Sequence, residues 1–204
     1  MVRSSLENLK AAPFDPGARV YIDRAQGGLD RLTTILARMT EATRLEQALG
    51  DAERERFDAV RVVAGCVDGY RLAYPQAMFA VSLPEGEVPL SGAPELYAQM
   101  LDKLIENAVG FSTDGEIDVR LERNAAMATL TVTNAGPPLP PGMEARLFES
   151  MVSVREGAAG DGPHLGLGLY IVQLIAQFHG GSATAQNREA PSGVAVIVSA
   201  PLAL

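Results

Sequence analysis

Three separated stretches of the chain carry residues whose types and spacing could bind a phosphorylated ligand. In the first, Gly166 and Gly168 flank one apolar residue and precede an apolar helical pattern that ends at Gly180-Gly181. Glycines at a helix N-terminus let the backbone approach an anion, which the unpaired N–H groups and the helix dipole attract. Such glycine pairs are also common in simple tight turns, so this stretch alone leaves both interpretations open.

The other two stretches each present an asparagine. Asn107 follows Gln99 and Lys103 at successive spacings of four, so the three side chains lie above one another on the polar face of a predicted helix. Asn134 and Gly136 come at the end of a strand in which threonines alternate with apolar residues. The simpler alternatives are a polar residue on a solvated helix face and an ordinary turn.

A long helix is predicted from about residue 18 to 49. Its apolar residues alternate spacings of four and three, which is typical of the seam of a helical bundle. A helix of this length must bury its stripe against something equally long, so a hairpin that dimerises into a four-helix bundle is favoured over packing on its own domain. The stripe consists of Ile22, Ala25, Leu29, Leu32, Leu36 and Met39.

The rest of the chain alternates helices and strands. A short helix is expected at 3–11, before the long one, and a charged connection at 51–56 marks the domain boundary. After it, the patterns predict helices at 59–70, 94–109 and 169–178, and strands at 79–83, 88–90, 117–121, 128–133, 183–186 and 194–200. Residues 153–163 hold three glycines and few apolar residues, so a mobile loop is expected there.

Composition excludes several classes of function. The chain has 204 residues and a net charge of −8, with no run of lysines or arginines, so nucleic acid is not expected as a partner. One cysteine and two histidines make a disulfide framework and a structural zinc site improbable. No stretch is apolar enough to span a membrane and none resembles a signal peptide, so we expect a cytoplasmic location for this part of the protein.

Four short motifs follow one another in the order of a known family. They resemble an asparagine box at 104–108, a first glycine box at 134–138, a phenylalanine box at 147–149 and a second glycine box at 166–169. The chain resembles the ATP-binding catalytic domain of bacterial two-component sensor histidine kinases, in the superfamily of gyrase-type topoisomerases and mismatch-repair ATPases. The resemblance implies an α/β fold: a two-layer sandwich of the Bergerat type, with a mixed, mostly antiparallel sheet and helices on one face, preceded by a helical hairpin.

The resemblance also implies roles for the two asparagines. The carboxamide oxygen of Asn107 would bind Mg²⁺, a hard cation that bridges nucleotide phosphates. Asn134 would accept a hydrogen bond from the adenine amino group, and Gly136 would let the ring approach the backbone. The family usually has aspartate where this chain has Asn134, and a neutral amide is a weaker acceptor than a carboxylate.

Lys103 is a second departure from the family. Kinases more often have asparagine or histidine at this position, and topoisomerases have a glutamate base. Lysine is not a base unless it is desolvated, but it can stabilise phosphate charge, so Lys103 and Asn107 are the predicted catalytic residues. A solvated helix lysine is the alternative. The resemblance adds further predicted contacts to ATP: Phe148, His164, Leu165, Gly166, Leu167, Gly168 and Leu169.

The phosphoacceptor histidine of this family is missing from the expected place. No histidine precedes His164, and residues 2–9 resemble the segment that follows the acceptor in sensor kinases. We therefore expect residues 1–50 to be part of a dimerisation hairpin, residues 51–204 to be the catalytic domain, and the parent protein to be an inner-membrane sensor with this part in the cytoplasm.

The predicted function is that of a protein histidine kinase. It would bind ATP and Mg²⁺, transfer the γ-phosphoryl group to a histidine outside this chain for relay to a response regulator receiver domain, and form a homodimer through residues 18–49. Two alternatives remain open. One is a pseudokinase of the same fold that binds nucleotide or a partner without transfer. The other is a serine kinase that restrains a sigma factor, which the long helix disfavours.

Overall fold

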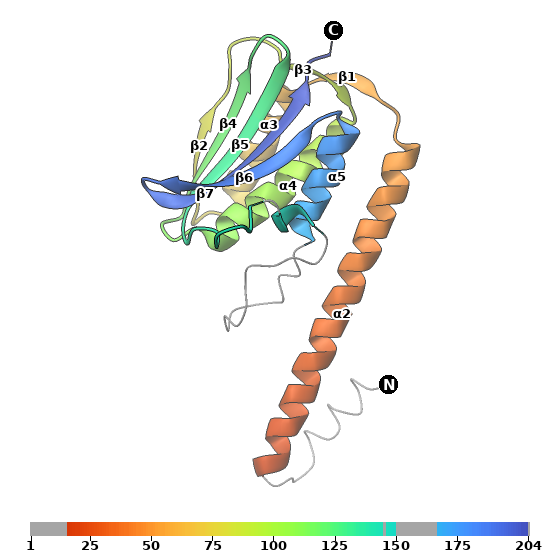
Figure 1. Ribbon diagram of the computed structural model, residues 1–204, viewed down its shortest axis with the longest axis vertical. Coiled ribbons are helices and arrows are strands. Elements are labelled where there is room, and N and C mark those ends of the chain that lie inside the picture. Colours follow the sequence, from red (N-terminus) through yellow and green to blue (C-terminus); the bar gives the residue numbers. More distant parts are fainter. Residues whose placement is uncertain (1–15, 145, 150–166, 204) are drawn as a thin grey trace.

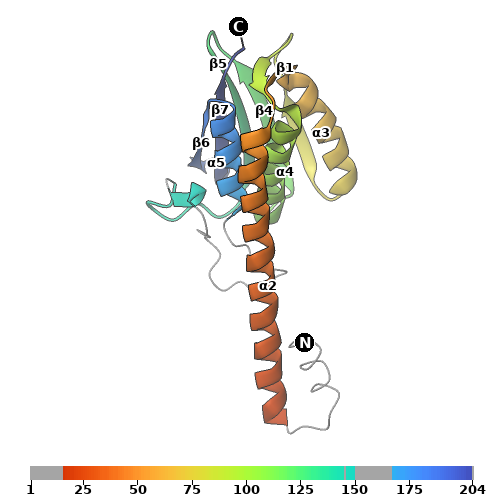
Figure 2. The ribbon, with the colours of Figure 1, turned by 90° about the vertical axis from the view of Figure 1, so that its right-hand side faces the viewer.

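The computed structural model describes residues 16–144, 146–149 and 167–203 (Figure 1). The helix predicted at 3–11 and the loop predicted at 153–163 lie outside the described residues. Within them, a long helix extends from a compact α/β unit that contains two sheets and three further helices, and Figures 1 and 2 show most of that helix projecting away from the unit.

Helix α2 spans Pro16–Asp51, in agreement with the prediction of a helix from about 18 to 49. The C-terminal end of α2 and its middle have different surroundings. Near the C-terminal end, Leu45 is buried in the hydrophobic core of the α/β unit and Leu49 packs against it. In the middle, Leu32 and Leu36 are 58% and 64% exposed. The apolar pattern of α2 therefore meets the core of the α/β unit at Leu45 and Leu49, while Ile22, near the other end of the helix, is also buried.

The main sheet has five strands in the order β2-β4-β5-β7-β6. Strands β2 and β4 are parallel, and every other pair is antiparallel. Apolar residues alternate with charged residues along β4 and with threonines along β5, which gives each strand one buried face. The strands are β2 (Met78–Ser82), β4 (Glu116–Arg123), β5 (Met127–Ala135), β6 (Ser182–Glu189) and β7 (Ser192–Pro201).

Three helices cover one face of this sheet, which confirms the predicted two-layer fold (Figures 1 and 2). They are α3 (Ala59–Ala73), α4 (Pro94–Phe111) and α5 (Gly168–Phe178), and η1 (Arg146–Phe148) is a short 3-10 turn. The side chain of Asp58 caps α3 by accepting from the N–H of Val60. Proline in its first turn starts α4, where the missing N–H costs nothing.

A second sheet of two strands joins the long helix to the α/β unit. Strand β1 (Glu55–Asp58) pairs antiparallel with β3 (Pro89–Gly92) along its whole length. The strand expected near 88–90 is thus confirmed, but the charged connection expected at 51–56 is shorter, because residues 55–58 are paired. A further backbone bridge joins Leu90 to Leu202, so β3 has a neighbour on each side.

Candidate active site

Asn107 and Gly168, which are far apart in sequence, meet at one end of two adjacent helices. Asn107 lies near the C-terminal end of α4, and Gly168 is the first residue of α5. A β-carbon on Gly168 would lie 3.6 Å from Nδ2 of Asn107 and 3.9 Å from its Oδ1. Asn107 of the polar row and Gly168 of the second glycine box therefore face each other directly, as a shared ligand site requires.

Helix α5 begins beside this contact without a side-chain cap. Leu167, at the N-cap position, is buried and supplies no side-chain hydrogen bond. An uncapped N-terminus presents N–H groups and the positive end of the helix dipole, which suits an anion such as phosphate. Gly168 and Leu169 form the first turn. His164, Leu165 and Gly166 lie outside the described residues, so their predicted nucleotide contacts remain predictions.

Asn134 lies near the end of β5, between Ile117 on β4 and Val194 on β7, and is 8% exposed. Its Nδ2 donates a hydrogen bond of 3.1 Å to the carbonyl oxygen of Ala135, which also accepts the N–H of Thr113 at 3.1 Å. Because a carbonyl oxygen only accepts, this contact identifies the amide nitrogen. The amide oxygen is then the atom that remains to accept from a ligand.

Gly136 is held against the end of α4. A β-carbon at this position would lie 2.4 Å from the carbonyl oxygen of Phe111, the last residue of α4, and 3.2 Å from Nδ2 of Asn134. The N–H of Gly136 donates to the carbonyl oxygen of Ser192 at 2.9 Å. Close backbone packing therefore already requires glycine here, and approach of a purine ring to this backbone remains a prediction.

A further glycine supports Asn134 from the neighbouring strand. A β-carbon on Gly193 would lie 2.0 Å from the carbonyl oxygen of Asn134, so β7 approaches β5 closely at this point. Gly193 belongs to none of the four sequence motifs and was not predicted as a residue of the site. Its signal was a glycine directly before an apolar strand, which often marks a close backbone approach.

Lys103 lies one helical turn before Asn107 on α4. Its Nζ is 3.5 Å from Oε2 of Glu106, and its side chain is 19% exposed while that of Glu106 is 55% exposed. An ion pair of this length in partly solvated surroundings stabilises weakly. Glu106 is one position before Asn107, so it lies off the row of Lys103 and Asn107, and its carboxylate pairs with Lys103.

Phe148 is buried beside α5 and is not exposed to solvent. It is buried in η1 with Leu147, and η1 packs against α5 and β6. A core role is therefore well supported for Phe148, and direct contact with nucleotide remains a prediction.

The residues present fit a magnesium ion that arrives with a nucleotide. Among the described residues, no group of three or more histidine, cysteine, aspartate or glutamate side chains could hold a metal ion by itself. Mg²⁺ is ordinarily bound through one or two protein oxygens together with substrate phosphates and water. The carboxamide oxygen of Asn107, next to the uncapped start of α5, matches that arrangement.

The chain is similar over nearly its whole length to known sensor kinases. It is 28% identical to the sensor protein ChvG of Rhizobium meliloti (strain 1021) over 196 residues, which is 91% of this chain and 34% of ChvG. It is 26% identical to the sensor histidine kinase TrcS of Mycobacterium tuberculosis over 190 residues, which is 90% of this chain and 37% of TrcS. The chain thus spans about a third of the length of these relatives.

Solved structures show the same fold. The histidine kinase ThkA in complex with the response regulator protein TrrA matches 99% of this chain and 57% of its own, with a TM-score of 0.69 and 20% identity. Among the described residues no helix is long and apolar enough to cross a membrane.

The family model of the histidine kinase-, DNA gyrase B-, and HSP90-like ATPases matches residues 92–204, more than half of the chain. The chain therefore belongs to this family, and its α/β unit is an ATP-binding domain of the sensor histidine kinase type.

Proposed function

We propose that this chain binds ATP with Mg²⁺ and is the catalytic part of a sensor histidine kinase, transferring the γ-phosphoryl group to a histidine outside this chain. The observation that carries the proposal is the contact between Asn107 and Gly168. It brings a neutral oxygen ligand for a hard cation next to an uncapped helix N-terminus, and this pair of features suits a nucleotide–magnesium complex.

Each described residue has a defined task in this proposal. Mg²⁺, when bound, neutralises charge on the phosphates. Asn107 orients the ion, the first turn of α5 binds phosphate through its N–H groups, and Lys103 adds a positive charge at the same end of α4. Oδ1 of Asn134 accepts from the amino group of adenine, since its Nδ2 is occupied by the carbonyl of Ala135.

The test is to replace Asn107 with alanine and to titrate the variant with ATP by calorimetry, with and without Mg²⁺. We expect the magnesium-dependent part of the affinity to disappear while circular dichroism and thermal stability stay unchanged. Gln99→Ala removes an amide two turns earlier on the same row of α4 and is the matched control. Affinity at the wild-type level in the Asn107 variant would show that this residue is not the metal ligand.

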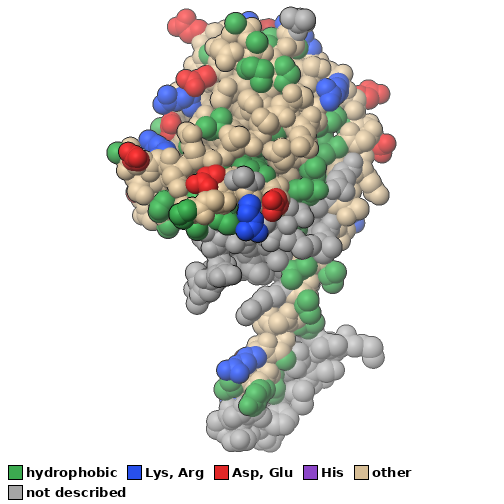
Figure 3. All heavy atoms as spheres, viewed as in Figure 1, with side chains coloured by type: hydrophobic (Ala, Val, Ile, Leu, Met, Phe, Trp, Pro, Cys, Tyr) green, Lys and Arg blue, Asp and Glu red, His purple; other side chains and the backbone are tan. Residues whose placement is uncertain are grey.

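Two partners follow from the same proposal. A second copy of the chain would pair along α2, whose Val20, Tyr21, Leu32 and Leu36 are exposed apolar side chains, and Figure 3 shows hydrophobic side chains along this helix. A response regulator receiver domain would take the phosphoryl group from the histidine, as the ThkA–TrrA complex suggests by analogy. Location in the cytoplasm, as part of a membrane-anchored sensor, belongs to the same proposal.

A nucleotide-binding pseudokinase is the second candidate. It is favoured by the neutral Asn134 and by Lys103, whose ammonium lies 3.5 Å from Glu106. The two candidates differ in whether the γ-phosphoryl group of ATP is transferred to a histidine. A version of the protein that includes an acceptor histidine would become labelled from radioactive ATP if the kinase proposal is correct, and would bind ATP without labelling if the pseudokinase is.

A further inference from the structure

Strand β6 carries one polar residue in the row of side chains that faces the helices. Side chains alternate between the two faces of a strand, so Ala183, Ala185 and Asn187 share one face. The two alanines are buried in the hydrophobic core, whereas Asn187 is exposed. An amide at the end of this row therefore needs an explanation other than core packing.

The carboxamide of Asn187 binds the backbone of Leu139 at two points. Its Oδ1 accepts from the N–H of Leu139 at 2.6 Å, and its Nδ2 donates to the carbonyl oxygen of the same residue at 3.0 Å. Because a carbonyl oxygen only accepts, the second bond identifies the amide nitrogen. The side chain of Asn187 thus takes the place that the backbone of a neighbouring strand would have beside Leu139.

Leu139 has the only backbone N–H between Gly136 and Gly142. The other residues of this stretch are prolines, which have no N–H: Pro137, Pro138, Pro140 and Pro141. The stretch can therefore donate a backbone hydrogen bond at one residue alone, and that bond goes to Asn187. The side chain of Leu139 packs against the hydrophobic core, so both its backbone and its side chain are held.

The segment from Gly136 to Leu139 passes over the start of β7. The N–H of Gly136 donates to the carbonyl oxygen of Ser192 on β7 at 2.9 Å, and Leu139 is bound to β6, the next strand of the sheet. The path from β5 to β6 covers two strand spacings, about 10 Å, and three residues of extended chain advance about 9–10 Å. Proline favours such an extended chain in itself and in the residue before it. The prolines thus give the segment its reach, and Asn187 anchors its far end.

The same anchor precedes the turn that leads into η1. The N–H of Met143 donates to the carbonyl oxygen of Pro140 at 3.1 Å, and Gly142 has a φ of +80°, as the third residue of a type II turn requires. The carbonyl oxygen of Met143 then accepts from the first two residues of η1, which packs against α5. The anchor at Leu139 therefore lies along the chain between the strand end that carries Asn134 and the turn that packs on α5.

We propose that Asn187 is a positioning residue of the nucleotide site, which clamps the segment from Gly136 to Leu139 over β7 and so fixes the backbone next to Asn134. The inference rests on the proposed function, since it assigns that backbone to the adenine side of a bound ATP. The clamp itself rests on the two hydrogen bonds to Leu139. Without them the backbone of the segment would be held at Gly136 but not at Leu139, and the chain beside the base would take several positions.

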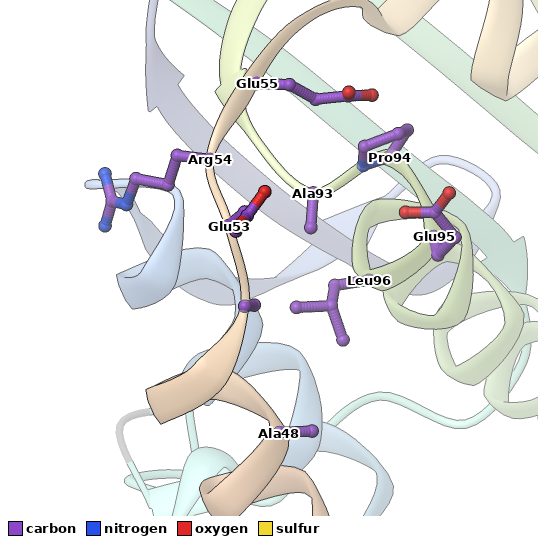
Figure 4. Close-up of a pocket in the computed structure, with 9 residues that line it drawn as sticks. Ala48, Glu53, Arg54, Glu55, Ala93, Pro94, Glu95 and Leu96 are labelled. Carbon is purple, nitrogen blue, oxygen red and sulfur yellow. The ribbon is translucent and has the colours of Figure 1, made fainter.

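A hollow of about 420 Å³ at the other end of α4 is a second place where a ligand could bind (Figure 4). The end of α2 and the start of α4 line it, together with Glu53, Glu55 and Glu95, while the side chain of Arg54 points away from it. The three carboxylates repel a triphosphate. A change in ATP affinity caused at Asn187 is therefore assigned to the proposed site and not to this hollow.

Hydrogen exchange at the amide of Leu139 tests the clamp in the full chain. Labelling with carbonyl-¹³C proline and ¹⁵N leucine selects the amides of the Pro–Leu pairs, which are those of Leu90, Leu139 and Leu202. The N–H of Leu202 donates to the carbonyl oxygen of Ala126 at 2.9 Å and serves as an internal reference. In Asn187→Ala we expect exchange at Leu139 to become at least about tenfold faster, because its N–H loses its acceptor, while Leu90 and Leu202 stay unchanged.

Two further variants sharpen this measurement. Asn187→Asp keeps an acceptor for the N–H of Leu139 but replaces the donor by a second oxygen, so an intermediate exchange rate is expected. Gln186→Ala is the matched control, because it removes an exposed amide from the preceding residue. Gln186 lies on the opposite face of β6 and its side chain makes no hydrogen bond to a described residue, so wild-type exchange at Leu139 is expected.

Affinities for ATP and for inorganic tripolyphosphate, each with Mg²⁺, separate positioning from a general structural role. Tripolyphosphate carries the phosphates but no base. In Asn187→Ala we expect ATP affinity to fall by about three- to tenfold, while tripolyphosphate affinity stays within about twofold of wild type. The melting temperature should stay close to that of wild type, because both lost hydrogen bonds are exposed to solvent.

Unchanged exchange at Leu139 in Asn187→Ala would overturn the clamp. Faster exchange with unchanged ATP affinity would overturn the positioning role, and an equal loss of affinity for ATP and tripolyphosphate would show that Asn187 acts on the fold as a whole. If the wild-type chain bound no ATP, the proposed function would fail and with it the assignment to adenine, whereas the exchange rate would still decide whether Asn187 clamps Leu139.

Discussion

The hydroxyl of Tyr70 donates a hydrogen bond of 2.5 Å to Oδ1 of Asp102, which connects α3 to α4. Tyr70 is buried, whereas Asp102 is exposed. Burial, followed by the hydrogen bond to Asp102, raises the pKa of Tyr70, so the phenol stays protonated and remains a donor. The two helices are thus joined by a neutral donor and a charged acceptor.

Tyr70→Phe should lower the free energy of unfolding by about 1–2 kcal/mol, because the lost hydrogen bond has a charged acceptor that water can reach. ATP affinity should be unchanged, since the pair lies between α3 and α4 and outside the proposed site. Urea unfolding and calorimetry measure the two quantities. Tyr74→Phe is the control, because the hydroxyl of Tyr74 makes no hydrogen bond to a described residue, and an equal loss in both variants would contradict the assignment.

Gly136→Ala should destabilise the domain by about 1–3 kcal/mol, because the new methyl group would lie 2.4 Å from the carbonyl oxygen of Phe111. Backbone shifts at this point would also displace Asn134, so weaker ATP binding is expected. Thermal unfolding checks the first result. Gly69→Ala on α3 meets no atom within 4 Å and should stabilise by about 0.5–1 kcal/mol, so destabilisation of that variant would disagree with this account of the glycines.

Asn134→Asp should separate stability from nucleotide binding. A carboxylate cannot donate to the carbonyl oxygen of Ala135, so the free energy of unfolding should fall by about 1–3 kcal/mol. ATP affinity should nevertheless be equal or higher, because a charged oxygen is the stronger acceptor for the adenine amino group. Lower affinity together with unchanged stability would show that Asn134 does not accept from the base.

His179 should make the stability of the chain depend on pH. Its Nδ1 lies 2.8 Å from the carbonyl oxygen of Ile175, and its buried Nε2 has no hydrogen-bond partner among the described residues. Burial lowers the pKa of His179 from the ordinary value of 6.5 and outweighs the backbone groups of Ile175 and Ala93, which act in the opposite direction. Below pH 6.5 the unfolded chain therefore binds more protons than the folded one, so stability is lost as the pH falls from 6.5 toward the folded-state pKa.

Urea unfolding at about pH 7.5 and about pH 5.5 measures this loss, and His179→Asn should reduce the difference between the two values. The carboxylates contribute equally to both proteins, so they cancel in the comparison. The same difference in wild type and variant would mean that His179 does not titrate in this range.

Leu32→Glu with Leu36→Glu should convert a dimer into a monomer, because both side chains are exposed on α2 and a second copy would bury them. Sedimentation of wild type and variant at matched concentrations measures the change, and ATP affinity should stay the same. Ala37→Glu places one charge on the adjacent face and should leave the dimer intact. Wild type that sediments as a monomer at high concentration would remove the proposal.

The fold was predictable where a pattern is long. The 3.6-residue period of α4 and the alternation of threonine with apolar residues in β5 each point to one structure, and a family resemblance placed them in order. Strand β1 was missed because Glu55–Asp58 has one apolar residue in four, and only its pairing with β3 makes it a strand. Short strands depend on partners that the local sequence does not reveal.

The sequence proposes the residue types of the candidate site but does not reveal their contacts. Gly136 could be recognised as part of a motif, yet the reason for a glycine lies in the carbonyl of Phe111, which belongs to another element. Likewise, the apolar period of α2 continues through Leu45 and Leu49, and nothing in that period shows that these two residues enter the domain core. The part of α2 that the α/β unit covers depends on the direction that the chain takes after Asp51.

The pairing of β3 with both β1 and the chain near Leu202 has a topological consequence. The strand where the chain enters the domain and the segment where it leaves lie on either side of β3, about 10 Å apart at ordinary strand spacing. A few residues could join them, and new termini could then be opened at an exposed turn such as 124–126. A circular permutant of this kind would keep every strand of both sheets, and the domain would lose only the part of its core that Leu45 and Leu49 of α2 supply.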